Sequence, residues 1–267
     1  MKEKIVSEIY IYPVKSLGGI SVKEAEVTER GFKYDRRWML IDSSGKFLTQ
    51  RSQPLMALIK VDISKDTIFF RNIKNTDQFS VGITETTGKK INSLVWNDQV
   101  ELMHVNSIAD EWFSQALNIK CKLLFMPDET KRKVDSEYAS NNEITSLSDG
   151  YPFLIIGQPS LDDLNRRLID IVPANRFRPN LVFTGGAPFE EDEMKRFTIC
   201  DVSFFSVKQC SRCVVITINQ NTAQKSEEPL RTLSSYRNFG GKVNFGMNLL
   251  HSGSGIIKVG DEIKIVE

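Results

Sequence analysis

Short runs of β-branched and aromatic residues recur along the whole chain, separated by residues that favour turns. Runs of this kind at roughly ten-residue spacing are typical of barrels and sandwiches built from many short strands. The sequence therefore predicts a mainly β fold with a few helices (α+β). The expected strands of the first half cover residues 5–14, 37–42, 47–51, 56–63, 67–71 and 90–96. Those of the second half cover residues 181–184, 202–207, 213–219, 243–250, 256–259 and 262–266.

Two pairs of these runs are expected to form hairpins. Gly45 lies in the turn between residues 37–42 and 47–51, where a residue free to adopt positive φ is favoured. Gly260 and Asp261 separate the last two runs, which predicts a terminal hairpin.

Two segments have helical rather than strand periodicity. Ser107 is expected to cap the first helix, with Asp110 in its first turn, and Ser160 is expected to cap the second. The apolar residues of the first helix that share one face are Ile108, Trp112, Phe113 and Leu117. The corresponding buried stripe of the second helix is Leu161, Leu164 and Leu168.

Residues 127–150 form a polar, charged stretch with few large apolar side chains. We interpret it as a long surface loop near a boundary between two β-rich parts. Loops of this length are often functional or mobile. The acidic run at residues 190–193 is interpreted as a second, solvated loop. A chain of 267 residues is long enough to bury a substantial core in one domain or two.

Charge and composition argue against several classes of protein. The formal net charge is only +1, so the chain as a whole does not attract nucleic acid or an anionic membrane surface. No apolar run approaches the roughly 20 residues that span a bilayer, and the first residues do not resemble a signal peptide. Four cysteines without an export signal suit free thiols in a reducing cytoplasm. We therefore expect a cytoplasmic protein that binds neither nucleic acid nor membrane.

The Cys-x-x-Cys pair of Cys210 and Cys213 is compatible with several chemistries. A structural zinc site needs four ligands, and this chain has no second pair and only two histidines. A thioredoxin-like redox pair opens a helix, whereas the β-branched run at residues 214–218 predicts a strand. The residues leave two possibilities open. Both thiols pack as small apolar groups, or one is a thiolate beside Arg212 that suits a soft metal or nucleophilic sulfur chemistry.

Basic residues at the ends of expected strands are candidates for holding a phosphate group, which requires cationic forks and backbone N–H groups. The candidates are Lys15 with Ser16, Arg36 with Arg37, and Arg178 with Asn180. The last pair is the stronger one. Pro179 is expected to restrict Arg178 to an extended backbone, and Asn180 offers both a donor and an acceptor.

Taken in order along the chain, several of these segments resemble the two-part form of the MOSC-domain family (molybdenum cofactor sulfurase C-terminal domain). The segments similar to its N-terminal β-barrel are residues 11–16 (IYPVKS) and 31–38 (GFKYDRRW). Those similar to its MOSC β-barrel are residues 177–180 (FRPN), 210–213 (CSRC), 228–233 (EPLRTL), 244–248 (NFGMN) and 257–261 (IKVGD). The resemblance covers essentially the whole chain. It implies an N-terminal β-barrel domain at residues 1–125 and a MOSC domain at residues 126–267, with a cofactor site shared between them.

Within this family the chain is most similar to the amidoxime-reducing components of mitochondria and their bacterial counterparts. The resemblance implies a molybdenum–molybdopterin cofactor, with Cys213 as the protein ligand to the metal and as the catalytic residue. It leaves Cys210 as a packing residue. The residues expected to bind the cofactor are Lys15, Ser16, Arg36, Asp149, Gly150, Tyr151, Arg178, Asn180, Ser211, Arg212 and Asn248.

The activity that the resemblance implies is a molybdenum-dependent oxidoreductase that reduces small N-hydroxylated compounds. A mitochondrial targeting segment is not evident at residue 1, which favours a cytoplasmic protein of the bacterial type. No iron–sulfur domain follows the MOSC segment, so we expect electrons from a separate donor protein of the ferredoxin, flavodoxin or reductase type. Two alternatives are a sulfur-carrying transferase that uses a Cys213 persulfide and a non-catalytic carrier of the molybdenum cofactor.

Overall fold

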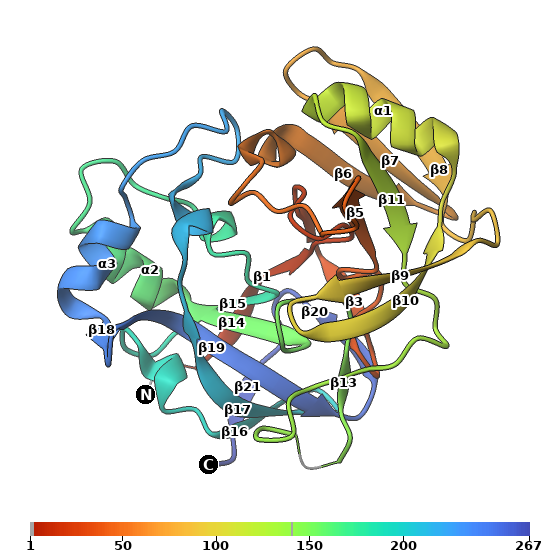
Figure 1. Cartoon of the computed structure of the whole chain (residues 1–267). Helices are drawn as coiled ribbons and strands as arrows, with labels where there is room; N and C mark the ends of the chain where they lie inside the picture. The colour runs from red at the N-terminus through yellow and green to blue at the C-terminus, as the bar shows by residue number, and fades with distance from the viewer. Residues whose placement is uncertain (1–2, 140) are drawn as a thin grey trace.

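The structure is a computed structural model that describes residues 3–139 and 141–267 (Figure 1). Strands dominate these residues, which confirms the predicted mainly β fold. The α-helices among them are α1 (Ser107–Leu117), α2 (Gln158–Asn165) and α3 (Leu230–Tyr236). Short 3-10 helices are η1 (Pro54–Leu58), η2 (Ala174–Arg176), η3 (Glu190–Asp192) and η4 (Val214–Thr217). None of the helices in the described ranges has the length and apolar character needed to cross a membrane.

The largest sheet joins the beginning of the chain to its end. Its strands, in spatial order, are β2 (Ile20–Val22), β1 (Ile5–Ile11), β15 (Leu181–Thr184), β14 (Phe153–Gly157), β19 (Lys242–Ser252), β17 (Val202–Ser211), β16 (Arg196–Ile199) and β21 (Ile263–Ile265), and β18 (Asn238–Phe239) pairs with β19. β1 is antiparallel to β15, with Ile5 opposite Thr184 and Ile9 opposite Leu181. The first strand of the chain is therefore built into a sheet whose other members, β2 apart, come from the second half.

Three smaller sheets involve mainly the first half of the chain. They are β5 (Trp38–Asp42), β11 (Cys121–Phe125), β10 (Asp98–His104) and β9 (Lys90–Val95); β6 (Ile59–Ser64), β7 (Thr67–Asn72) and β8 (Gln78–Gly82); and β3 (Glu24–Thr28), β4 (Gly31–Phe32) and β20 (Gly255–Lys258). α1 packs on this half (Figure 1), where Phe113 and Leu117 join a core that contains Trp38 and Phe70. Burial of each such side chain stabilises the fold by roughly 1.5–3 kcal/mol.

The polar stretch at residues 127–150 is only partly a surface loop. It forms a two-stranded sheet of β12 (Arg132–Lys133) and β13 (Ile144–Thr145), and Leu147 near its end is fully buried. Buried Arg132 holds the end in place by donating to the carbonyl oxygens of Ser146 (3.0 Å) and Ser148 (2.6 Å). The surface-loop prediction is wrong for this end of the stretch, which is buried. Its backbone carbonyl oxygens lie outside any regular sheet, and the Arg132 guanidinium supplies the hydrogen-bond donors that they need.

The helix caps differ from the predicted ones. Asn106, not Ser107, caps α1, since its Oδ1 accepts a hydrogen bond of 2.7 Å from the Ala109 N–H. Ile108 in its first turn is 67% exposed and therefore lies off the buried face. α2 begins at Gln158, so Ser160 lies inside the helix rather than at its cap, and Leu161 and Leu164 are buried as predicted.

Residues 190–193 are not a solvated loop. Glu191 is fully buried and accepts hydrogen bonds from the Gly157 N–H (3.1 Å) and the Ser160 hydroxyl (2.7 Å). Burial raises the pKa of the Glu191 carboxyl. Asp192 forms an ion pair with Arg237. This acidic run therefore fixes α2 to the rest of the second half by polar contacts that composition does not reveal.

Three strand predictions are wrong, wholly or in part, and so is the terminal hairpin. Residues 47–51 form no strand, and only Phe47 among them forms a β-bridge, with Ile41. The segment after Cys213 is the 3-10 helix η4, and residues 56–58 belong to η1. The last two runs do not pair with each other. β20 pairs with β3 and β21 with β16, which allows Ile257 and Ile263 both to reach the core of the largest sheet. Tertiary packing thus overrides the local hairpin signal at Gly260.

Candidate functional site

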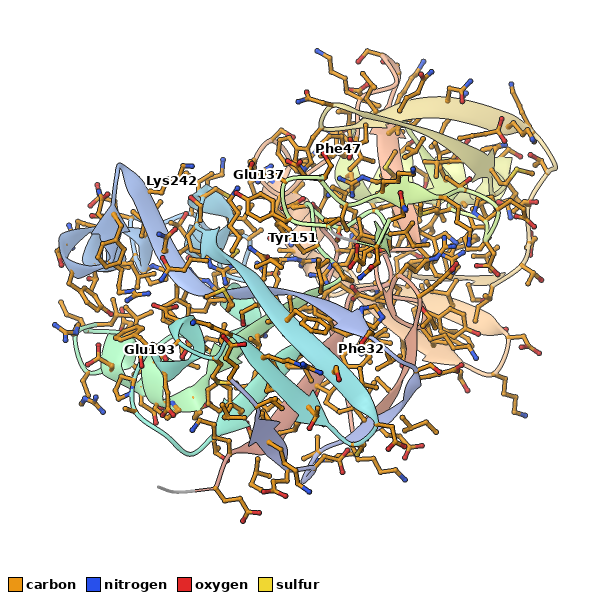
Figure 2. All side chains as sticks on the ribbon, turned by 90° about the horizontal axis from the view of Figure 1, so that it is seen from below. Phe32, Phe47, Glu137, Tyr151, Glu193 and Lys242 are labelled. Atoms are coloured by element: carbon orange, nitrogen blue, oxygen red, sulfur yellow. The ribbon has the colours of Figure 1, made fainter. Side chains whose placement is uncertain are left out.

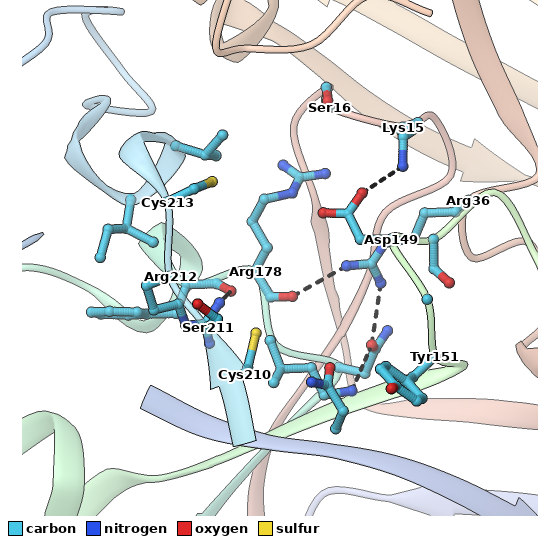
Figure 3. A pocket seen from close by; sticks show the side chains of 18 of the residues that line it. Lys15, Ser16, Arg36, Asp149, Tyr151, Arg178, Cys210, Ser211, Arg212 and Cys213 are labelled. Carbon is cyan, nitrogen blue, oxygen red and sulfur yellow. Dashed lines mark hydrogen bonds and ion pairs between the residues drawn. The ribbon is translucent and has the colours of Figure 1, made fainter. Parts of the chain in front are cut away.

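A pocket lies between the two halves of the chain, where the end of β17 faces loops from the N-terminal half (Figure 3). Figure 2 places Tyr151, one of its residues, near the centre of the molecule. The lining includes every residue that the sequence predicted for the site: Lys15, Ser16, Arg36, Asp149, Gly150, Tyr151, Arg178, Asn180, Ser211, Arg212, Cys213 and Asn248. The fold brings these residues together from positions far apart in the sequence. Their roles in binding stay predictions.

The pocket has a strong excess of positive charge. Its ionised side chains are one carboxylate, Asp149, and six cations: Lys15, Arg36, Arg51, Arg176, Arg178 and Arg212. Cations gathered in a pocket with so few counter-ions repel one another, and an anionic ligand would relieve that repulsion. The lining therefore favours a ligand that carries negative charge.

Lys15 and Asp149 form one ion pair on the wall of the pocket. The buried Lys15 ammonium donates to Asp149 Oδ1 (2.6 Å) and to the carbonyl oxygen of Leu147 (2.8 Å). Burial lowers the pKa of Lys15, and Asp149 opposes that shift. Desolvation acts to raise the pKa of the Asp149 carboxyl, but Lys15, Arg51 and Arg36 outweigh it and hold that pKa well below its usual value. Asp149 stays ionised and fixes the Lys15 ammonium toward the pocket.

Arg36 and Arg178 both lie over the ring of Tyr12. Their guanidinium carbons lie 4.4 Å and 4.3 Å from the Tyr12 ring centroid, within the range of cation–π attraction. Arg36 donates to Asp35 Oδ2 (2.6 Å) and to the carbonyl oxygen of Arg178 (3.2 Å). A Cβ at Gly19 would lie 2.4 Å from Tyr12 Cε1, so only glycine leaves room for this ring. The stack sets both arginines in place before any ligand binds.

Arg178 does not have the extended backbone that Pro179 predicts. Its φ is +56°, in the left-handed region that residues with a Cβ rarely occupy. The side chain turns back to donate to the carbonyl oxygen of Leu17 (2.7 Å). Burial, with the charge of Arg36, lowers the pKa of Arg178 to about 10, so it remains a cation at neutral pH. Backbone strain held in this way is typical of ligand sites.

Arg212 has an unused donor. Its Nε donates to the carbonyl oxygen of Phe245 (2.8 Å) and its Nη1 to that of Phe177 (2.9 Å). Its Nη2 is buried and has no hydrogen-bond partner among the described residues. A buried N–H without an acceptor costs about 1–3 kcal/mol, and a ligand acceptor at this position would recover that cost.

The two thiols lie on the opposite side of the pocket from Lys15 and Asp149 (Figure 3). Both are free, and burial raises the pKa of Cys210. Cys213 is half-buried, and its Sγ accepts a hydrogen bond of 3.3 Å from Arg51 Nε. A 3-10 helix, rather than the predicted strand, follows Cys213. A thioredoxin-like pair opens an α-helix, whereas residues 214–217 form the 3-10 helix η4.

Sequence reasoning missed several lining residues, notably Thr49, Arg51, Ser148 and Arg176. Arg51 carried a usable signal, because it ends a predicted strand in the way that Lys15 and Arg36 lie at strand ends. The Nε of Arg176 donates to the carbonyl oxygen of Ile216 (2.8 Å), which anchors η4. Thr49 and Ser148 belong to no chemical pattern that the sequence shows.

Comparison with known proteins agrees with this architecture. Residues 3–120 match the MOSC N-terminal beta barrel domain, and residues 142–264 match the MOSC domain. The chain belongs to the MOSC family, in the form that carries the N-terminal barrel.

Similar curated proteins fall into two groups. Mitochondrial amidoxime-reducing component 1 is 32% identical in Homo sapiens and 30% identical in Mus musculus, in each case over 98% of this chain and 82% of the relative. Molybdenum cofactor sulfurase of Oryza sativa subsp. japonica is 32% identical over 92% of this chain. The chain spans only about a third of that sulfurase, 33% of its length.

Proposed function

We propose that this protein binds a molybdenum–pterin cofactor and reduces N-hydroxylated compounds. The observation that carries the proposal is the two-sided pocket, with cations fixed by hydrogen bonds on one side and the half-buried Cys213 thiol on the other. The printed names of the amidoxime-reducing relatives support the reaction class, and those of the sulfurases support the cofactor. The cytoplasmic location and a soluble electron donor belong to the same proposal.

The residues present fit such a cofactor. A phosphorylated pterin needs cationic donors for its phosphate and acceptors or donors for its ring edges. Arg178, Lys15 and Arg36 supply the cations, and the Nη2 of Arg212 supplies a buried donor that has no acceptor among the described residues. Cys213 supplies one thiolate, a soft ligand that suits molybdenum better than a hard cation. Cys210, with its raised pKa, is a packing residue in this proposal.

When bound, molybdenum supplies the two-electron chemistry that removes oxygen from nitrogen. The protein's part is to hold and orient. Arg178 and Lys15 anchor the anionic end of the cofactor, and Arg51 fixes the direction of the Cys213 sulfur through its hydrogen bond. The substrate takes up two electrons and two protons and releases one water. The electrons come from a separate donor protein of the ferredoxin, flavodoxin or reductase type.

Metal analysis of protein from a host that makes the cofactor, with pterin fluorescence after oxidation, tests the proposal. We expect molybdenum and pterin in near-equal amounts, and reduction of benzamidoxime with an artificial electron donor. Cys213→Ser should lose metal and activity, the latter by at least about 100-fold, since loss of a direct ligand exceeds the 10–100-fold typical of its supporting residues. Cys210→Ser, the matched control, should keep both. Unchanged activity in Cys213→Ser would refute the proposal.

A second candidate is a sulfur-carrying transferase, favoured by the sulfurase relatives and by the accessible Cys213 thiol. It predicts a Cys213 persulfide, which mass spectrometry of metal-free protein would detect. A non-catalytic carrier would instead contain pterin and molybdenum but show no turnover with any reductant.

A further inference from the structure

Trp96 occupies an unusual position at the tip of a hairpin. It follows β9 and precedes β10, and its φ of +58° lies in the left-handed region that favours Gly, Asn and Asp. A bulky aromatic residue is rare there, and its side chain remains 43% exposed. A strained backbone that fixes the position of an exposed aromatic ring is more typical of ligand sites than of packed cores.

Three contacts hold the Trp96 ring. Its Nε1 donates to Asp149 Oδ1 (3.3 Å), and the guanidinium of Arg51 lies 4.8 Å from its ring centroid. Phe47 packs edge-to-face against it at 5.3 Å and 76°. Asp149 and Arg51 both line the pocket, so the hairpin tip is attached directly to the pocket wall. The ring cannot rotate away without losing a hydrogen bond and a cation–π contact.

The Trp96 ring is linked to the Cys213 sulfur through Arg51. Arg51 contacts Trp96 through its guanidinium and Cys213 through its Nε, which is 3.3 Å from the sulfur. Val214, the residue after Cys213, is 47% exposed. Exposed apolar side chains from both halves of the chain therefore flank the pocket, Trp96 on its Asp149 side and Val214 next to the thiol. Such a rim suits the apolar body of a ligand whose polar group reaches the sulfur.

We propose that Trp96 is a specificity-determining residue whose exposed surface stacks on the planar, conjugated body of the substrate. The pocket then prefers aryl N-hydroxylated compounds to saturated ones of equal size, because offset stacking on an indole needs a flat π-system. This inference rests on the proposed function. Asp149 and Arg51 hold the indole in its stacking orientation, so the ring binds substrate with little loss of side-chain entropy.

Steady-state kinetics of the loaded protein tests the preference with two substrates of matched size, benzamidoxime and cyclohexanecarboxamidoxime. In Trp96→Leu, KM for benzamidoxime should rise about 3- to 10-fold, the loss expected for one aromatic pair. KM for the cyclohexyl compound and both kcat values should not change. Trp96→Phe should restore most of the aryl preference. Leu94→Ala, which removes an exposed apolar side chain from the same strand, should behave as wild type. An equal rise of KM for both substrates, or a fall of both kcat values, would show that Trp96 acts only by holding Arg51 and would overturn the proposal.

Tryptophan fluorescence gives a second measurement that needs no turnover. The chain has three tryptophans, and Trp38 is 1% exposed and Trp112 is half-buried in the core around α1. The difference between wild type and Trp96→Phe isolates the emission of Trp96. Benzamidoxime, added without reductant, should quench this component, and the cyclohexyl compound should not. Quenching without any reduction of N-hydroxylated compounds would refute the proposed function while supporting aryl binding. Reduction of benzamidoxime without quenching would overturn the role of Trp96.

Discussion

The two sides of the pocket are built in opposite ways. On one side Lys15 is buried and Arg178 is half-buried, and both are fixed by hydrogen bonds to backbone carbonyl oxygens. On the other side Cys213 is half-buried and its neighbours Ser211 and Val214 are exposed. Burying cations costs free energy that one carboxylate does not fully offset. That cost suits a ligand that stays bound, whereas the open thiol side suits a ligand that exchanges during turnover.

Arg178→Met tests the cationic side of the pocket and has the largest expected effect. It removes the charge but keeps an extended side chain, and it should weaken binding of the cofactor by about 2–5 kcal/mol. The free energy of unfolding of the cofactor-free protein should change by no more than about 1 kcal/mol, because relief of the buried charge offsets the lost hydrogen bond to Leu17.

The measurements for Arg178→Met are pterin content after purification and urea unfolding of cofactor-free protein. Lys33→Met, which removes an exposed cation paired with Glu26, is the control and should affect neither. A large loss of stability with normal pterin content would mean that Arg178 stabilises the fold and does not bind the cofactor. The contrast drawn between the two sides of the pocket would then be wrong.

Gly19→Ala tests whether the Tyr12 ring positions Arg36 and Arg178. The new Cβ would collide with the Tyr12 ring, which should lower the free energy of unfolding by about 1–3 kcal/mol. Pterin content should also fall, since Arg36 and Arg178 both rest on that ring. Tyr12→Phe keeps the ring and removes a buried hydroxyl that lacks a partner among the described residues, so it should cost little. Wild-type stability and pterin content in Gly19→Ala would contradict this role.

Asp149→Asn has the smallest expected effect and a distinctive pH dependence. The folded protein lowers the pKa of Asp149, so its ion pairs stabilise the fold above the ordinary carboxyl pKa, near 4, and are lost as the pH falls below it. The variant should therefore be less stable than wild type at pH 7, by at most about 1 kcal/mol since the carboxyl is 68% exposed. Urea unfolding between pH 3 and 7 should show a constant difference down to about pH 4 and a shrinking one below it. A difference in the free energy of unfolding that grows as the pH falls would contradict a stabilising role for this ion pair.

Much of the site could be predicted from the sequence because its residues belong to recognisable short segments. Lys15, Arg178 and Cys213 lie in motifs whose chemistry is legible without a structure. Arg51 and Trp96 do not, since their importance depends on contacts between a hairpin tip and a loop far away in the sequence. Local sequence patterns indicate local structure. Neither of two distant segments carries a pattern that predicts the contact between them.

The fold was predictable in class and less so in detail. Alternating burial in β1 and the wholly buried β14 follow from their apolar residues. The segment after Cys213 has strong β propensity but forms η4, because Arg176 captures the carbonyl oxygen of Ile216 and Ile216 packs into the core. The pairing of β21 with β16 also lies beyond local signals. In each case a tertiary contact outweighs a weak local preference.

The pairing of β1 with β15 has a consequence for synthesis of the protein. Residue Ile9 reaches its partner Leu181 only after most of the chain has left the ribosome, and the pocket needs Asn248 as well. Such non-local pairing makes folding slow compared with that of a helical bundle. The pocket therefore cannot be complete before nearly the whole chain has been made. A ligand held by Lys15, Arg178 and Asn248 together can bind only after residue 248 has been translated.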